Sequence, residues 1–236
     1  MLIYGFHPVR EALRLRPQEV ERVLLSDRAQ RARVMEIEKL CRRCGVCAES
    51  HPAEKLDELT SGAVHNGFVA EVRARTAPGH GADAELVVLL EDVQDPRNLG
   101  AILRVCEGAG VGRVLIRDRG SAPLSAAAIK TSAGAAEYLR IDRVTNSANE
   151  IQALQKDGFW VYGADGAGEP VWNVDLTGKV CLCLGGEEKG LRPRTRKLCD
   201  RLVALPMRGR VESLNVATAS AALLYEAVRQ RQGNGD

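Results

Sequence analysis

The spacing of apolar and polar residues changes along this chain near residue 73. Before that point, short helical patterns alternate with short extended patterns, which predicts a small α/β domain over residues 1–72. Residues 73–84 then collect Gly, Pro and Ala without apolar periodicity, which is typical of an interdomain linker. Helices are expected at residues 8–15, 32–44 and 53–59, and strands at residues 20–26, 46–50 and 68–72.

From residue 85 onward, nearly continuous apolar runs alternate with helical patterns. Such runs are typical of strands that are covered on both faces. The alternation predicts a mainly parallel sheet with right-handed crossover connections. The fold class is therefore α/β, with a second domain over residues 85–236. Its predicted strands lie at residues 85–92, 113–118, 138–144, 159–165, 179–185 and 200–206.

The last helical stretch, residues 213–232, carries apolar residues on more than one face. A helix that is apolar over so much of its circumference needs a second surface against it. Its small residues allow another helix to approach closely, and we therefore expect a homodimer interface here. The alternative is that the helix packs only against its own sheet. The small residues are Ala217, Ala219, Ser220, Ala221 and Ala222.

Three of the predicted strands end in a polar bend that contains glycine and leads into a helix. These bends lie within residues 91–104, 182–191 and 205–217. The carboxyl ends of parallel strands meet at one edge of a sheet, and open α/β sheets bind ligands at that edge. The sequence therefore predicts that the three bends form one site.

Composition limits the class of protein but does not select a function. With 236 residues, of which 45% are hydrophobic, the chain can build a proper core. It has no uninterrupted apolar run of about 18 residues and no leader pattern at its start, so we expect a cytoplasmic protein without a membrane segment. The net charge of +2 does not by itself indicate nucleic acid. Only seven of the 33 basic residues are lysines, and arginine suits phosphate groups better than lysine does. A GC-rich genome would give the same excess of arginine, so the excess alone does not indicate a nucleic-acid partner.

Four residues of the first domain have a spacing that is compatible with zinc. They are Cys41, Cys44, Cys47 and His51. The surrounding pattern places them on a helix and on a strand, which would separate the thiols, and no metal is expected. The seven cysteines are expected to be reduced packing residues.

Glycine-rich stretches elsewhere lack the order of a nucleotide-binding loop. Residues 108–112 (GAGVG) follow a helix and precede a strand, so they are expected to end that helix. Residues 163–170 follow a strand without leading into a helix, and they are expected to form a mobile loop. The signatures GxxxxGK[ST] and GxSxG do not occur in the sequence, which removes the usual signs of phosphoryl transfer and serine hydrolysis.

The three bends carry motifs that resemble a known family. DPxNxGA followed by Arg104, GxExxG at residues 185–190 and PMxGxxxSLNVA at residues 206–217 are similar, in this order and spacing, to the motifs of the SpoU branch of SPOUT RNA 2′-O-methyltransferases. The resemblance covers residues 86–230. In the first domain, YGFHPVREAL and HNGFVAEV resemble the RNA-binding domain of those members that methylate a guanosine ribose of large-subunit ribosomal RNA.

This resemblance implies a fold and an activity. The expected enzyme is a homodimer that assembles its site between two subunits, with a deep C-terminal trefoil knot. It would transfer a methyl group from S-adenosylmethionine to a ribose 2′-hydroxyl of RNA, without a metal. The expected substrate is a guanosine of 23S ribosomal RNA. A transfer RNA ribose methyltransferase and a non-catalytic RNA-binding protein of ribosome assembly are the alternatives.

The resemblance also implies roles for individual residues. Arg104 is expected to polarise the ribose hydroxyl through a phosphate, since a guanidinium stays protonated and is a poor general base. Asn98 is expected to tie the bends together or to orient Glu187. The expected catalytic group is Arg104, Asn98, Glu187, Ser213 and Asn215. The expected cofactor-binding group is Leu184, Gly185, Gly186, Glu187, Leu205, Pro206, Met207, Ser213, Leu214, Asn215 and Ala217.

Each role has a structural alternative. Arg104 could be a solvated helix arginine, and Glu187 could cap the turn that follows it. Ser213 could be the N-cap of the last helix.

Overall fold

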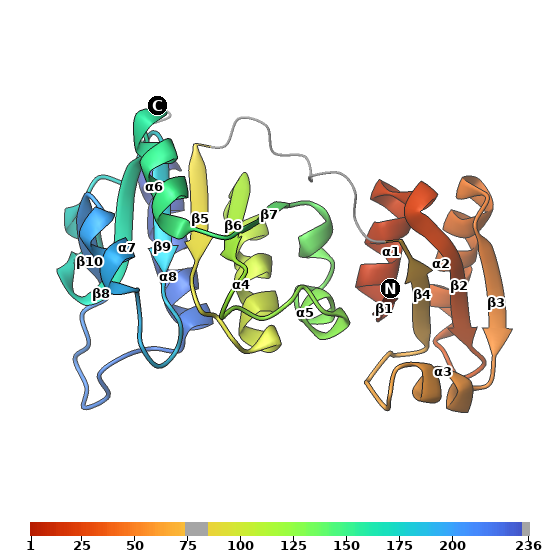
Figure 1. The fold of residues 1–236 in the computed structure, drawn as a ribbon. Helices are drawn as coiled ribbons and strands as arrows, with labels where there is room; N and C mark the ends of the chain where they lie inside the picture. Colours follow the sequence, from red (N-terminus) through yellow and green to blue (C-terminus); the bar gives the residue numbers. More distant parts are fainter. Residues whose placement is uncertain (74–84, 233–236) are drawn as a thin grey trace.

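The computed structural model describes residues 1–73 and 85–232. Most of the predicted linker, residues 74–84, and the last four residues lie outside this description. The chain forms two sheets, one of four strands in its first part and one of six strands in its second part. Figure 1 shows them side by side, with helices α1 and α5 at the junction.

The N-terminal sheet has the strand order β1-β4-β2-β3. Strand β4 is antiparallel to both β1 and β2, whereas β2 and β3 are parallel. All six predicted elements are present, and the short strand β1 was not predicted. Helix α2 ends at Gly45, whose φ of 69° is the left-handed conformation that glycine favours. The elements are β1 (Leu2–Tyr4), α1 (Phe6–Leu15), η1 (Pro17–Glu19), β2 (Val20–Ser26), α2 (Arg31–Cys44), β3 (Cys47–His51), α3 (Ala53–Leu59) and β4 (Phe68–Val72).

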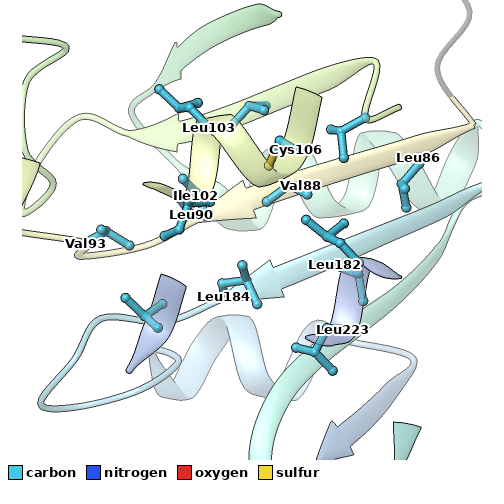
Figure 2. Packing of buried hydrophobic residues seen from close by; sticks show 14 of the residues in the cluster. Leu86, Val88, Leu90, Val93, Ile102, Leu103, Cys106, Leu182, Leu184 and Leu223 are labelled. Carbon is cyan, nitrogen blue, oxygen red and sulfur yellow. The ribbon is translucent and has the colours of Figure 1, made fainter. Parts of the chain in front are cut away.

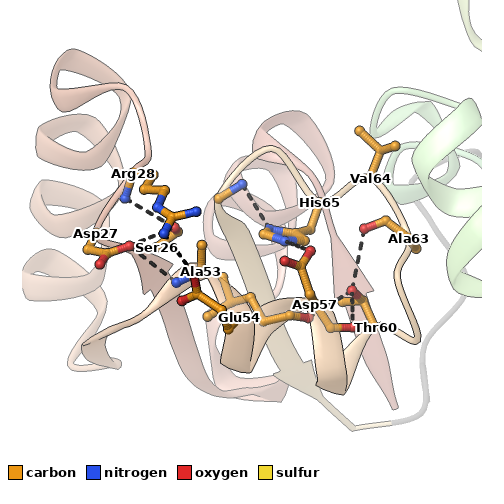
Figure 3. Close-up of polar contacts among 12 residues, drawn as sticks. Ser26, Asp27, Arg28, Ala53, Glu54, Asp57, Thr60, Ala63, Val64 and His65 are labelled. Carbon is orange, nitrogen blue, oxygen red and sulfur yellow. Dashed lines mark hydrogen bonds and ion pairs between the residues drawn. The ribbon is translucent and has the colours of Figure 1, made fainter.

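A buried histidine fixes the bend that leads into β4. His65 is 8% exposed, and its Nε2 lies 3.0 Å from Oδ1 of Asp57. Its Nδ1 accepts a hydrogen bond from the backbone N–H of Gly67 at 3.0 Å, which assigns the Nε2 proton to the bond with Asp57. Figure 3 shows His65 beside Asp57, and also Asp27, which accepts from the backbone N–H of Ala53 at the start of α3. The role of His65 here is structural.

The C-terminal sheet has the strand order β10-β8-β9-β5-β6-β7, and every neighbouring pair is parallel. The predicted α/β class and parallel sheet are confirmed. Its strands are β5 (Leu86–Leu90), β6 (Arg113–Arg117), β7 (Arg140–Val144), β8 (Trp160–Pro170), β9 (Val180–Leu184) and β10 (Arg201–Ala204). Its helices are α4 (Pro96–Gly108), α5 (Ala126–Thr131), η2 (Ala135–Glu137), α6 (Ser147–Lys156), η3 (Val171–Asn173), α7 (Pro193–Leu198) and α8 (Val216–Gln232).

The central strands of this sheet are covered on both faces. Alternate residues of β5 and β9, including Val88 and Leu182, pack on one face with Leu103 of α4 and Leu223 of α8 (Figure 2). The other alternate residues, such as Leu89, pack with α6 on the opposite face. Because both faces of such a strand are buried, the side chains on both faces are apolar, and this explains the continuous apolar runs in the sequence.

Residues 163–170 are not a mobile loop, contrary to the expectation. They form the last eight residues of β8, and Val203 of β10 pairs with Glu169 after a register shift. The prediction failed because strand pairing uses backbone groups, which a Gly- and Ala-rich segment supplies without any apolar pattern. A Cβ on Gly168 would lie 2.5 Å from the carbonyl carbon of Leu202, so the close approach of the two backbones requires glycine.

Helix α8 begins at Val216, three residues later than predicted, and packs against α4. One of its faces is buried within this chain, which does not decide between the two interpretations of this helix. Those residues are Val216, Ser220, Leu223, Leu224 and Ala227. Its other side leaves Ala222 and Tyr225 exposed. The homodimer stays a prediction.

Two buried side chains join the N-terminal and C-terminal parts directly. Arg16 donates from Nε to Oε2 of Glu137 at 2.6 Å and from Nη2 to Oε1 at 2.9 Å. These two side chains are 10% and 3% exposed. The hydroxyl of Tyr138 also donates to Glu11 of α1, and Lys130 of α5 donates to the carbonyl of Val64. Side-chain contacts therefore hold the two sheets together, in addition to the chain that connects them.

Candidate functional site

The three bends meet at the carboxyl edge of the C-terminal sheet, as predicted. Asn98 in the first turn of α4 donates from Nδ2 to Oε1 of Glu187, in the bend after β9, at 2.8 Å. Asn215 in the bend after β10 donates from Nδ2 to Oδ1 of Asn98 at 3.1 Å. One asparagine thus connects both other bends, which is the linking role expected of Asn98.

Helix caps place these side chains. Asp95 is the N-cap of α4 and accepts a hydrogen bond from the backbone of Arg97 at 2.7 Å, which leaves Asn98 in the first turn. At α8, Oδ1 of Asn215 accepts from the backbone N–H of Ala217 at 2.9 Å. The N-cap of α8 is therefore Asn215, and the interpretation of Ser213 as that cap is wrong. Both residue types are good caps, so their order in the sequence could not decide between them.

A cavity of about 330 Å³ opens between the second and third bends. Eight of the residues predicted to bind a cofactor line it, whereas Pro206, Asn215 and Ala217 do not belong to its lining. The volume lies within the ordinary range for small-molecule sites. The eight are Leu184, Gly185, Gly186, Glu187, Leu205, Met207, Ser213 and Leu214.

The glycines of the second bend are required by close backbone packing. A Cβ on Gly185 would lie 2.0 Å from the carbonyl carbon of Gly190, and one on Gly186 would lie 2.3 Å from the carbonyl oxygen of Asp92. Gly190 itself has a φ of 60°. Residues Gly186 and Gly190 also form an isolated β-bridge, so the bend folds back on itself tightly. Its backbone forms part of the cavity wall.

Two acidic residues directly after β5 hold the segment that follows this bend. Glu91 is 1% exposed and accepts from Oγ1 of Thr195 at 2.8 Å and from the backbone N–H of Arg192 at 3.3 Å. Asp92 accepts from Nε and Nη2 of Arg192 at 2.7 and 3.0 Å, and from Arg117 at 3.2 Å. Our sequence interpretation missed these residues. Two adjacent carboxylates at the end of a fully apolar strand were the available signal.

Other lining residues come from elements that the sequence could not place. Ala164, Asp165 and Gly166 belong to β8, which lies between β9 and β10, so its carboxyl end must lie between the second and third bends. Asp165 is paired with Arg196 at 2.8 Å. Local patterns predict a strand but not its neighbours in the sheet. The remaining lining residues are Glu188, Gly190, Val203, Ala204, Glu212, Val216, Ala219 and Leu223.

Arg104 does not belong to the cavity lining. It lies in the second half of α4 and is exposed. Asn98 and Arg104 are six residues apart, about 600° of helical rotation, so the two side chains leave the helix on different sides. Within this chain, the structure brings together the predicted groups of the three bends and leaves Arg104 apart from them.

The zinc-like cysteines lie on two elements. Cys41 and Cys44 are on α2, while Cys47 and His51 are on β3. The thiol of Cys44 donates to the carbonyl of Leu13, and His51 lies 3.0 Å from Glu49. Across residues 1–73 and 85–232, no group of His, Cys, Asp or Glu side chains is arranged to hold a metal ion. In the same part of the chain, no helix combines the length and the apolar character needed to cross a membrane.

Comparison with known proteins assigns both parts of the chain. Residues 85–225 match the SpoU rRNA Methylase family, and residues 2–78 match the family described as RNA 2'-O ribose methyltransferase substrate binding. A curated relative, the 23S rRNA (guanosine-2'-O-)-methyltransferase RlmB of Xanthomonas axonopodis pv. citri, is 40% identical over 98% of this chain and 97% of that protein.

Solved structures are similar as well. The SpoU methyltransferase AviRb from Streptomyces viridochromogenes has a TM-score of 0.83 at 26% identity, covering 99% of this chain and 90% of that chain. A TrmH/SpoU tRNA modifying enzyme from A. aeolicus has a TM-score of 0.60 at 27% identity, covering 66% of this chain and 80% of that chain. With its three motif bends joined at one cavity and its match to the family over residues 85–225, this chain belongs to the SpoU rRNA methylase family.

Proposed function

We propose that this protein is an S-adenosylmethionine-dependent RNA ribose 2′-O-methyltransferase that acts on a guanosine of 23S ribosomal RNA. The observation that carries the proposal is the contact of Glu187, Asn98 and Asn215 beside the cavity. It joins the three motif bends of the family in one place. The near full-length similarity to a protein named as a 23S rRNA (guanosine-2'-O-)-methyltransferase supports the substrate.

The cavity suits a ligand that combines apolar and polar groups with a positive charge. Leu184, Leu205 and Leu214 supply apolar walls, and the tightly folded bend at Gly185 brings backbone groups to the same space. Glu187 places a carboxylate in the lining, which favours a cationic ligand. S-adenosylmethionine supplies an electrophilic methyl group on a positively charged sulfur. These residues would hold it.

The side chains around the cavity then have distinct tasks. Asn98 fixes the carboxylate of Glu187, so that its charge is oriented in advance. Ser213 lies in the lining and offers a hydroxyl for hydrogen bonding, while Asn215 fastens the start of α8. Arg104 binds the phosphate next to the reacting ribose and stabilises the negative charge that develops on the 2′-oxygen.

We propose that the active enzyme is a homodimer. Arg104 lies apart from the cavity of its own chain, so a second copy would bring its arginine to that cavity. The exposed side of α8, with Ala222 and Tyr225, is the proposed contact surface. The C-terminal trefoil knot and the cytoplasmic location belong to the same proposal.

We further propose that residues 1–72 are the RNA-docking domain, residues 73–84 the linker and residues 85–236 the catalytic domain. The substrate-binding family match over residues 2–78 supports the first assignment. It also favours ribosomal over transfer RNA, since the similarity to the tRNA modifying enzyme covers only 66% of this chain. A non-catalytic RNA-binding protein would have no need for the joined bends and the cavity.

Methyl transfer to purified RNA tests the proposal. The protein is incubated with S-adenosylmethionine carrying a labelled methyl group and with either ribosomal or transfer RNA from cells that lack this gene. Label on a 2′-oxygen of 23S RNA is expected. Label on transfer RNA alone would favour a transfer RNA ribose methyltransferase. No binding of S-adenosylmethionine in calorimetry at millimolar concentration would favour a non-catalytic RNA-binding protein.

A further inference from the structure

Three cationic or polar side chains of the N-terminal part gather around one aromatic ring at the junction. The guanidinium carbons of Arg10 and Arg33 lie 5.3 and 4.9 Å from the centre of the Phe6 ring. The imidazole of His7 meets the same ring edge to face at 5.2 Å. Phe6 itself is 6% exposed, because these side chains pack around its ring. Two separate helices, α1 and α2, contribute to the cluster.

The positive charge of Arg104, in the C-terminal part, also acts on His7. The pKa of His7 lies below its ordinary value of 6.5 because of partial burial and because of the positive charges of Arg10, Arg33 and Arg104, with Glu11 opposing them. The imidazole is therefore neutral at neutral pH. Arg104 comes from α4 and Arg33 from α2, so the field at His7 is built from both parts of the chain.

Two of these arginines have no acidic partner. Within residues 1–73 and 85–232, neither Arg33 nor Arg104 forms an ion pair. Arg10 differs, since its Nε lies 2.6 Å from Glu11, and Glu11 also accepts from Tyr138. Glu36 also lies 3.8 Å from Nη1 of Arg10, so both nearby carboxylates pair with Arg10. The unpaired guanidinium groups of Arg33 and Arg104 leave a local positive charge that an anion can neutralise.

The position of this cluster relative to Arg104 is set by packing. The buried ion pair of Arg16 and Glu137 and the bond from Lys130 to the carbonyl of Val64 tie α1 and its sheet to the α5 region. Helix α5 in turn packs tightly on α4, where a Cβ on Gly100 would lie 2.4 Å from the carbonyl oxygen of Ala128. A continuous chain of contacts therefore runs from α1 to the helix that carries Arg104.

We propose that His7, Arg33 and Arg104 form one seat for an RNA phosphate, so that the N-terminal part completes the catalytic surface and is not only a distant anchor. The inference rests on the proposed function, because it assigns the seat to the phosphate beside the reacting ribose. Guanidinium forks match phosphate oxygens, and a neutral imidazole adds a hydrogen-bonding group without further repulsion. The RNA is then held jointly by both parts of one chain.

Charge reversal at Arg33 tests the seat, with Arg43 as the matched control. Arg43 is also exposed and lies on α2, ten residues or about 15 Å further along the helix. Binding of unmodified 23S ribosomal RNA is measured at several salt concentrations for R33E, R33Q and R43E. We expect R33E to weaken binding about tenfold and to lower the slope of log affinity against log salt by about one, with R33Q in the same direction and R43E close to wild type. His7→Ala is expected to weaken binding less than R33E.

Turnover separates this inference from the proposed function. At saturating donor, R33E should methylate 23S RNA more slowly at low RNA concentration and bind S-adenosylmethionine as the wild type does. Equal RNA affinity and salt slope for R33E and R43E would overturn the seat even if the wild type is an active methyltransferase. A wild type that binds 23S RNA but transfers no methyl group would instead overturn the proposed function. Thermal unfolding of each variant confirms that it is folded.

Discussion

The amide of Asn98 lies between Glu187 and Asn215 and uses both of its ends. Its Nδ2 donates to Glu187 at 2.8 Å, and its Oδ1 accepts from Asn215 at 3.1 Å. These partners are 89 and 117 residues further along the chain. A single side chain therefore sets the relative positions of three bends that follow three different strands.

Asn98→Ala should weaken donor binding without unfolding the protein. Two hydrogen bonds are lost, at about 1 kcal/mol each, which predicts roughly 30-fold lower affinity for S-adenosylmethionine. Asn98→Asp should be worse, because it places a second carboxylate against Glu187. Calorimetric titration measures both. Asn149→Ala, an exposed asparagine on α6, is the control and should bind as the wild type does; equal affinity for all variants would remove Asn98 from the donor site.

Asn215 has two roles that two substitutions can separate. Asn215→Ala removes the N-cap of α8 and should lower the free energy of unfolding by about 1 kcal/mol. Asn215→Asp keeps an oxygen for the backbone N–H of Ala217 but cannot donate to Asn98. Urea unfolding should therefore find the aspartate variant near wild type in stability, while its methyl transfer is reduced. If both variants lose the same stability, the cap is not what the side chain provides.

Gly185→Ala should distort the second bend. Its Cβ would lie 2.0 Å from backbone atoms of Gly190, which cannot move aside as a flexible side chain could. We expect a cost of about 1–3 kcal/mol in donor affinity, roughly 5- to 150-fold. Gly209→Ala is the comparison, since nothing lies within 4 Å of the added atom. A Gly185 variant that binds donor as well as the Gly209 variant would contradict the packing argument.

The sequence predicted the parts of the site that depend on local chemistry. Each strand, bend and helix start has its own signal, such as the apolar run before Glu91 or Asp95 followed by proline at the start of α4. Glycine spacing also identified the tight bend at Gly185. These features need no knowledge of distant residues.

The missed features all depend on contacts between distant segments. Asp165 lines the cavity because β8 lies between β9 and β10, and strand order leaves no mark in a local pattern. Glu91 meets Thr195 across 104 residues, and no spacing rule connects such a pair. Arg104 was expected to face the RNA and not to bind the cofactor, so its absence from the cavity lining leaves that role a prediction.

Acid should weaken the docking of α8 through Glu226. Hydrogen bonds from Arg229 and Gln230 lower the pKa of this carboxyl from 4.5 to about 2. Since the folded state takes up this proton less readily than the unfolded state, the contribution is fully present above pH 4.5 and is lost as the pH falls toward 2. Gln230 also accepts from the backbone N–H of Leu176 at 2.7 Å, so Glu226 helps fasten the end of α8. Urea unfolding at pH 6 and pH 3 should show a smaller loss of stability for Glu226→Gln than for wild type.

The buried ion pair of Arg16 and Glu137 should be the strongest single polar link between the two parts. Arg16→Ala removes the guanidinium from a carboxylate that is 3% exposed, which predicts a loss of about 3–5 kcal/mol. The matched control is Arg28→Ala, whose ion pair with Glu54 has a similar length of 2.7 Å but is 72% and 63% exposed, so its loss should be about 1 kcal/mol or less. The double variant R16M/E137L removes both charges of this pair and should recover part of the stability. Its recovery is incomplete because the buried Glu19, which accepts from Nη1 of Arg16 at 2.7 Å, loses that contact. Chemical denaturation gives the free energy of unfolding of all three variants. Equal losses of stability for Arg16→Ala and Arg28→Ala would contradict the argument that burial makes the Arg16–Glu137 pair important for holding the N-terminal part.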